Sequence, residues 1–201
     1  MDGIAMEINN KKDILLLLLY SPGITDEINE SIRGRTRIVK MMYLFKKEVL
    51  KHFKKGTEIT EENFYKFFPW NFGPFSTEVY DDLTFFVLQQ FVREEDCFDE
   101  PALPESEEEW EAWLDNSGIG SEENRYDEYY EREYILTGKG INFVRQKLWC
   151  VLSNSQKKLL KEFKAKLTNV PLRALVRYVY SHYPEDTINS VIKDDVLGGT
   201  Y

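Results

Sequence analysis

The segment REYILTGKGINFVRQKL, residues 132–148, joins two different sequence patterns. Its first part contains EYILT, residues 133–137, whose residue types are those of a β-strand. Its second part has apolar residues three and four positions apart, which is the spacing of a helix with one buried face. A helix is therefore expected to begin at Thr137 or Gly138, directly after a short strand.

The segment LQQFVREE, residues 88–95, supplies a partner for this strand. It ends a predicted helix and then becomes strand-like, so residues 91–94 are expected to pair with residues 133–137. Helix, short strand, turn, short strand and helix follow one another in this order in a winged helix-turn-helix. The sequence therefore predicts a mainly α fold with a small β-hairpin wing, namely a winged-helix-like helical domain with extra C-terminal helices.

Other helices follow from apolar residues at helical spacing and from residues that favour helix starts. They are expected over residues 13–20, 34–55, 155–167 and 171–183, and in a segment that begins at Ser76 or Thr77. The intervening residues 64–75 contain two prolines and a glycine. Irregular backbone is expected there, because proline disfavours the helical conformation of the residue before it.

The net charge of −9 is distributed unevenly along the chain. Residues 33–55 carry nine Lys and Arg residues against one Glu, and residues 139–173 again carry nine against one. Residues 93–133 carry seventeen Asp and Glu residues against three Arg residues. Because the local field determines what a surface attracts, the acidic total does not exclude an anionic partner.

Residues 94–131 form an acidic insertion between the two strands of the predicted hairpin. The insertion belongs to a first unit, residues 1–148, and a helical extension, residues 149–201, is expected to pack on that unit. Within the insertion, SEEEWEAWL is expected to form a short helix with Trp110 and Trp113 on one face. The insertion is interpreted as a solvated loop, as a segment that folds over the basic helix and masks it, or as a segment that imitates nucleic acid or binds a basic partner.

The bulk composition indicates a globular protein without a membrane span. Hydrophobic residues make up 42% of the chain and charged residues 30%. The longest apolar run, ILLLLLY at residues 14–20, is far shorter than the roughly 20 residues that a membrane-spanning helix needs. Cys97 and Cys150 make no disulfide framework, so a cytoplasmic location is expected.

The sequence carries no signature of an enzyme. The motifs of serine hydrolases, phosphate-binding loops and dinucleotide-binding folds are absent from it. His52 lies in a basic run and is interpreted as a surface residue, whereas His182 is interpreted as a helix-end residue. Neither has a Cys or carboxylate at metal-ligand spacing. We therefore expect a non-enzymatic protein without catalytic residues, a metal or a cofactor.

The segment FYKFFPWNFGPFSTEVYDDL, residues 64–83, is rich in aromatic residues. Trp70 and Phe72 lie in a proline-bounded turn in which the side chains cannot all point inward. A protruding aromatic residue there could anchor a partner, as interface hot spots do. The core beneath the flanking helices is expected to be filled by the other aromatic residues, namely Phe64, Phe67, Phe68 and Phe75.

Clustered cations precede and begin the basic helix, and they are candidate nucleic-acid-binding residues: Arg33, Arg35, Arg37 and Lys40. A loop-to-helix junction with clustered arginines presents backbone N–H groups and guanidinium groups together. The alternative is an ordinary solvated helix face, and the lysines of residues 157–166 allow the same two interpretations.

Three motifs resemble the Panacea domain of SocA-like antitoxins and the related YwgA-like proteins of prokaryotes. They are IRGRTRIVKMMYLFKKE (residues 32–48), NFGPFSTEVYDDL (71–83) and LTGKG (136–140). The tail LVRYVYSHYPEDTINSVIKDDVL, residues 175–197, is similar to the tail of YwgA-like members. The resemblance implies a winged-helix-like module that neutralises or regulates a toxin-like partner protein.

The sequence is therefore compatible with two functions. In the first, an antitoxin-like module binds its partner through a surface that combines Trp70, Phe72, Tyr80, Trp110 and Trp113. In the second, the chain is a winged-helix DNA-binding transcriptional regulator. The second function is less favoured, because the expected recognition helix carries three acids in its first two turns, where they would repel phosphates: Glu78, Asp81 and Asp82.

Overall fold

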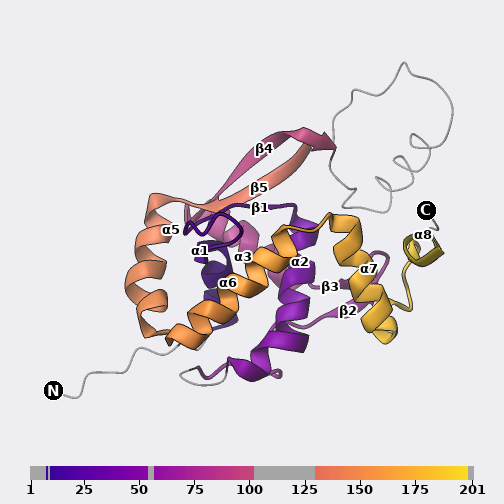
Figure 1. Ribbon diagram of the computed structural model, residues 1–201, viewed down its shortest axis with the longest axis horizontal. Coiled ribbons are helices and arrows are strands. Elements are labelled where there is room, and N and C mark those ends of the chain that lie inside the picture. Colours follow the sequence, from indigo (N-terminus) through magenta and orange to yellow (C-terminus); the bar gives the residue numbers. More distant parts are fainter. Residues whose placement is uncertain (1–7, 9, 54–56, 102–129, 199–201) are drawn as a thin grey trace.

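The computed structural model of the chain describes residues 8, 10–53, 57–101 and 130–198. The protein is mainly helical with a small antiparallel sheet, as predicted (Figure 1). The α-helices are α1 (Lys11–Tyr20), α2 (Arg35–Leu44), α3 (Thr77–Leu88), α5 (Gly138–Phe143), α6 (Asn154–Thr168), α7 (Leu172–His182) and α8 (Lys193–Gly198). Short π or 3-10 segments are η1 (Phe45–Val49), η2 (Leu50–His52), η3 (Val144–Leu148), η4 (Trp149–Val151) and η5 (Pro184–Thr187).

The main sheet contains β1 (Ile32–Arg33), β4 (Val92–Pro101) and β5 (Tyr130–Leu136) in the order β1-β5-β4. Val92 pairs with Leu136, so the predicted pairing of these two strands is confirmed. β4 continues to Pro101, seven residues beyond the strand end expected at residue 94. Arg132 of β5 helps the acidic strand to form, because its guanidinium lies 3.2 Å from a Glu94 carboxylate oxygen and neutralises it across the ladder.

A second antiparallel hairpin, β2 (Phe68–Trp70) and β3 (Gly73–Phe75), lies where irregular backbone was expected. Pro69 pairs with Pro74 in this hairpin. Since two opposed prolines have no N–H to donate, they must occupy the non-hydrogen-bonded position of the ladder, where no bond is lost. Gly73 has φ +82°, a conformation that favours glycine.

One hydrophobic core runs through the described chain. α1 is buried from Ile14 to Tyr20 because it packs against β5, η3 and α6. The ring of Phe45 contacts Phe64 and also Phe163 of α6, with centroids 5.8 Å apart in both pairs. The C-terminal helices therefore share the core of the residues before them, and among the described residues no separate core follows residue 148.

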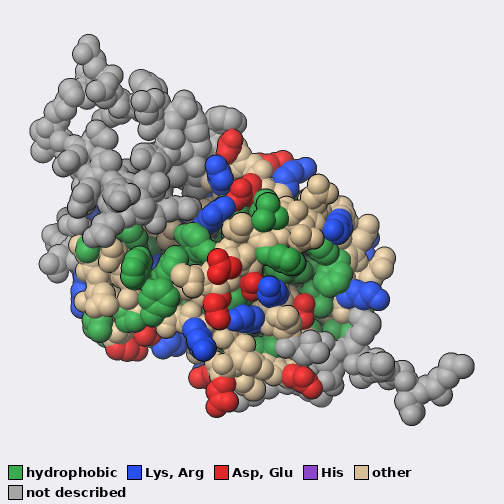
Figure 2. Space-filling model, turned by 180° about the vertical axis from the view of Figure 1, so that it is seen from behind, with side chains coloured by type: hydrophobic (Ala, Val, Ile, Leu, Met, Phe, Trp, Pro, Cys, Tyr) green, Lys and Arg blue, Asp and Glu red, His purple; other side chains and the backbone are tan. Residues whose placement is uncertain are grey.

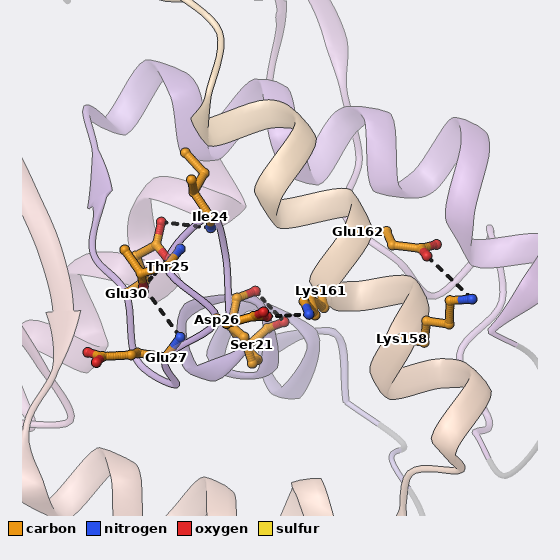
Figure 3. A network of polar contacts seen from close by, with 10 residues as sticks. Ser21, Ile24, Thr25, Asp26, Glu27, Glu30, Lys158, Lys161 and Glu162 are labelled. Atoms are coloured by element: carbon orange, nitrogen blue, oxygen red, sulfur yellow. Dashed lines mark hydrogen bonds and ion pairs between the residues drawn. The ribbon is translucent and has the colours of Figure 1, made fainter.

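The loop between α1 and β1 is fixed by polar contacts within itself and with α6 (Figure 3). The Glu30 carboxylate accepts hydrogen bonds from the backbone N–H groups of Ile24 (3.1 Å) and Thr25 (3.0 Å). Lys161 of α6 forms an ion pair with Asp26. The contacts with Glu30 shape the loop, and the exposed ion pair of Asp26 lies where the loop meets α6.

Candidate partner-binding surface

Lys40 lies inside the protein, although its place on the basic helix suggested an exposed cation. Its side chain is only 2% exposed. Its Nζ donates to the backbone oxygens of Phe72 (2.5 Å) and Pro74 (3.0 Å). Lys40 therefore fastens the β2–β3 hairpin to α2, and its ammonium group does not face solvent, where it could meet a phosphate.

The three candidate arginines do not form an exposed cluster with Lys40 either. Arg37 is buried, and its Nη1 donates to two carbonyl oxygens at the end of α6, each 2.7 Å away. Arg35 pairs with Glu94 at 2.6 Å, and Arg33 pairs with Glu133 at 3.0 Å. These cations join α2 and β1 to other elements, and nucleic-acid binding by them stays a prediction.

Aromatic side chains of the β2–β3 hairpin and α3 form a continuous cluster that reaches the surface. We call it the aromatic surface: Phe68, Trp70, Phe75 and Tyr80. The centroid of Phe75 lies 5.7 Å from Phe68, 6.3 Å from Trp70 and 5.0 Å from Tyr80. Trp70 is 49% exposed and Phe68 is 38% exposed, while the other two rings are partly buried beneath them.

Other predicted aromatic positions have different surroundings. Phe64 is buried in the core as expected, and Phe67 is partly buried and packs against the core. Phe68 was expected in the core but is exposed on the hairpin. Phe72 was expected to protrude but is partly buried against the core, since its backbone is held by Lys40. The other two predicted partner-binding residues, Trp110 and Trp113, lie outside the described residues.

The backbone that carries Trp70 is tied to the C-terminal segment. The carbonyl oxygen of Asn71 accepts hydrogen bonds from the Val191 N–H and the Ser190 hydroxyl, both at 2.9 Å. Tyr180 of α7 fills the space beside Gly73, where a Cβ atom would lie 2.8 Å from its ring. A turn held in this way loses little conformational freedom when a partner binds.

Further apolar side chains stand beside the hairpin on the C-terminal segment. Ile188 is 67% exposed and Val191 is 57% exposed. Figure 2 shows hydrophobic side chains gathered on the side of the molecule where Figure 1 places α7 and α8. Apolar groups exposed together in this way are typical of interaction surfaces.

Arg35 connects the aromatic surface to the β4–β5 hairpin. Its guanidinium carbon lies 5.7 Å from the centroid of Tyr80, within the range of a cation–π contact. The same group donates to Glu94 at 2.6 Å and to the Tyr134 hydroxyl at 2.6 Å. Although burial opposes it, hydrogen bonding from Arg35 lowers the pKa of Glu94 below its ordinary value, so this carboxylate stays ionised near neutral pH.

Phe68 and Phe75 were missed as surface residues because the hairpin was not recognised. In a strand, residues two positions apart share a face, which would have grouped Phe68 with Trp70. Phe75 stands directly opposite Phe68 in the ladder. The available signal was the short Asn71-Phe72 turn followed by glycine, which is typical of a hairpin.

Two buried lysines make the stability of the protein depend on pH. Burial lowers the pKa of both Lys40 and Lys164 to about 7, well below the 10.5 of a solvated lysine. Between these values the unfolded chain binds more protons than the native state, so the free energy of unfolding rises with pH. We expect a slope of up to about 1.4 kcal/mol per pH unit for each lysine. Urea unfolding at several pH values between neutrality and the onset of tyrosine ionisation measures this slope.

The Lys40→Met variant is the control for this experiment. It removes one of the two titrating groups and should roughly halve the slope, whatever its effect on stability at a single pH. A profile that is flat or falls over the same pH range would show that both lysines remain protonated in the native state.

Comparisons with known proteins found no relative: no family model, curated protein or solved structure matches the chain. No helix in the described part is long and apolar enough to cross a membrane. Among the same residues, no three His, Cys, Asp or Glu side chains are grouped so that they could hold a metal ion.

Proposed function

We propose that the chain is a non-enzymatic, cytoplasmic regulatory module that binds and neutralises a partner protein in the manner of an antitoxin. The observation that carries the proposal is the aromatic surface, with Trp70 exposed on a fastened hairpin. Large aromatic residues provide much of the binding energy at protein interfaces, and rigid ones do so at low entropic cost.

The winged-helix-like architecture belongs to this proposal. Its support is the succession α1, β1, α2, α3, β4, β5 together with the sheet order β1-β5-β4. The resemblance of three sequence motifs to Panacea-type antitoxins points to the same kind of module. In such a module, the β2–β3 hairpin between α2 and α3 would be the element that presents the binding residues.

The partner should be identified from source cells with and without nuclease, and its affinity for variants should then be measured. We expect Trp70→Ala to weaken binding by about 2 kcal/mol or more, which is about 30-fold, because a central aromatic contact is lost. Leu88→Ala is the matched control, since Leu88 is 74% exposed on α3 outside the aromatic surface. Equal affinities of wild type and Trp70→Ala would exclude this surface.

A DNA-binding regulator is the second candidate, and the same element order favours it. The sequence of α3, TEVYDDLTFFVL, contains no Lys or Arg. Two of its three acids face α1, with Lys11 2.8 Å from Glu78 and Lys12 2.8 Å from Asp82. Neutralising these acids weakens the repulsion expected from the sequence but supplies no phosphate-binding cation. Nuclease-sensitive co-purification of nucleic acid alone would favour this candidate over the antitoxin-like one.

A further inference from the structure

A long stretch of the chain carries cations without any acid. Between Glu133 and Glu162 there is no Asp or Glu, whereas six Lys and Arg residues occur: Lys139, Arg145, Lys147, Lys157, Lys158 and Lys161. This stretch contains α5, η3, η4 and the first half of α6. The residues of the aromatic surface all lie outside this stretch.

Four of these cations belong to the elements that meet at the junction of η3, η4 and α6. We call them the basic surface: Arg145, Lys147, Lys157 and Lys158. Trp149 lies at the centre of the junction, with Lys157 Nζ 5.6 Å from its centroid. Tyr20 contacts both Trp149, at 5.2 Å between centroids, and Arg145, at 3.4 Å from its hydroxyl to Nε. Arg145 and Lys157 therefore belong to one chain of contacts around the same pair of aromatic rings.

Among the described residues, the cations of the basic surface are only weakly compensated. Arg145, Lys147 and Lys158 are exposed, and Lys157 is half-buried beside Trp149. The acid nearest in the sequence is Glu162, which lies 3.7 Å from Lys158 in a pair whose side chains are 75% and 62% exposed. Exposed pairs of this kind contribute little and are screened by salt.

The acidic part of the described chain points away from this junction. Figure 1 shows the β4–β5 hairpin along the top of the molecule with its tip at the upper right, whereas α6 begins at the lower left. At physiological ionic strength, charges separated by more than about 8 Å of solvent are largely screened. The positive potential of the junction is therefore local and is not cancelled by the net charge of −9.

The chemistry of this surface suits a phosphodiester backbone better than a protein. Protein interfaces are depleted in lysine and enriched in apolar anchors. None of the exposed large apolar residues in the described chain falls between residues 138 and 168. The exposed neighbours are uncharged polar residues of the kinds that bond phosphate and sugar oxygens: Gln146, Ser153, Asn154 and Ser155.

We propose that the junction of η3, η4 and α6 is a sequence-independent nucleic-acid-binding surface that contacts the phosphodiester backbone. The contacts come from Arg145, Lys147, Lys157 and Lys158, and not from the arginine cluster at the start of α2. This binding is separate from the partner binding of the aromatic surface, so each is tested by its own assay.

The test measures binding of the full chain to a short fluorescent DNA duplex of arbitrary sequence by anisotropy. If each of the four cations contacts one phosphate, the affinity should fall about 150-fold between about 50 and about 200 mM salt. The variant Arg145→Gln/Lys147→Gln/Lys157→Gln should lose about three contacts and fall only about 3-fold over the same range. At the lowest salt it should bind clearly more weakly than the wild type.

The matched control removes the same number of charges elsewhere. Lys166, Arg173 and Arg177 are exposed at the end of α6 and on α7, and the triple substitution of these residues by Gln changes the net charge identically. We expect this control to bind the duplex as the wild type does. An equal loss in both variants would mean that net charge alone determines binding, which would overturn the assignment.

Two further probes separate nucleic acid from other polyanions. Poly-glutamate and vesicles containing phosphatidylserine are offered at the same salt concentrations. Binding to either probe that is as tight as binding to the duplex would replace the proposal by an acidic protein or a membrane surface. Absence of duplex binding by the wild type at the lowest salt would refute it directly.

Discussion

Replacing Gly140 by alanine is expected to destabilise the protein by about 3 kcal/mol or more, because the added Cβ meets backbone that cannot move aside. Gly140 is buried in the first turn of α5. A Cβ atom here would overlap the carbonyl oxygen of Phe91 and lie 3.1 Å from its carbonyl carbon. The same oxygen accepts the Thr137 N–H at 3.0 Å, so it is fixed where β4 begins. The clash can be relieved only by separating α5 from β4.

Gly138, two residues earlier in the same turn, is the control. It is exposed, and a Cβ atom at this position would meet nothing within 4 Å. Gly138→Ala should therefore leave stability unchanged or raise it by up to about 1 kcal/mol, since alanine favours the helix. Urea unfolding of both variants measures the difference. If Gly140→Ala were as stable as Gly138→Ala, the close packing of α5 on β4 would not exist in solution.

This turn also shows why part of the fold could be predicted from the sequence. The motif LTGKG contains a strand end, a capping threonine and two glycines within five residues. α5 begins at Gly138, one of the two expected starts, and the Thr137 hydroxyl caps it by accepting the Gly140 N–H at 3.2 Å. The pairing of β4 with β5 was also predictable, because strand-like residues lay on both sides of the insertion. Each of these signals lies within a few residues of the chain, and here the local preferences agree with the fold.

The burial of the cations on α2 could not be predicted from such local patterns. Helical spacing indicates which residues share a face, but it does not say whether another element covers that face. α7, β3 and α3 pack against α2, so eight consecutive residues of it are buried, including Arg37 and Lys40. Both side chains are long enough to reach backbone carbonyl groups that would otherwise be left without donors. A buried cation paired in this way has the same sequence signature as a solvated one.

The sequence predicted that one residue of the aromatic surface is exposed, but it did not predict how far this surface extends. Trp70 was expected to protrude, because a proline-bounded turn cannot turn every side chain inward. The contribution of Phe68 and Phe75 depends on the ladder between β2 and β3. That ladder is held from outside by Lys40 and by residues of the C-terminal segment more than a hundred positions away. Long-range contacts of this kind leave no trace in a local pattern.

Replacing Lys164 by methionine is expected to destabilise the protein by roughly 3–5 kcal/mol at alkaline pH, where the buried amine is neutral in the native state. Lys164 of α6 is fully buried, and its Nζ donates to three backbone oxygens: those of Leu19 (2.9 Å), Ser21 (2.8 Å) and Glu30 (2.6 Å). Two of these carbonyl groups lie at the end of α1, where the helix itself provides no donors. Methionine fills a similar volume but leaves all three oxygens without a partner in the interior, so the loss reflects hydrogen bonding rather than a cavity.

The Lys161→Met variant is the control, because it removes an equal positive charge from α6 at a partly exposed position. It tests whether the loss of stability in Lys164→Met comes from burial of the side chain or from its charge alone. Lys161 lies one turn earlier, is 43% exposed and pairs with Asp26, which is 70% exposed, so its loss should cost less than about 1 kcal/mol. Urea unfolding compares the two variants, and hydrogen exchange should show faster opening of the loop between α1 and β1 in Lys164→Met only. Equal stability of the two variants would mean that water reaches the three carbonyl oxygens. The loop between α1 and β1 would then be held in place by something other than the contact between α6 and the end of α1.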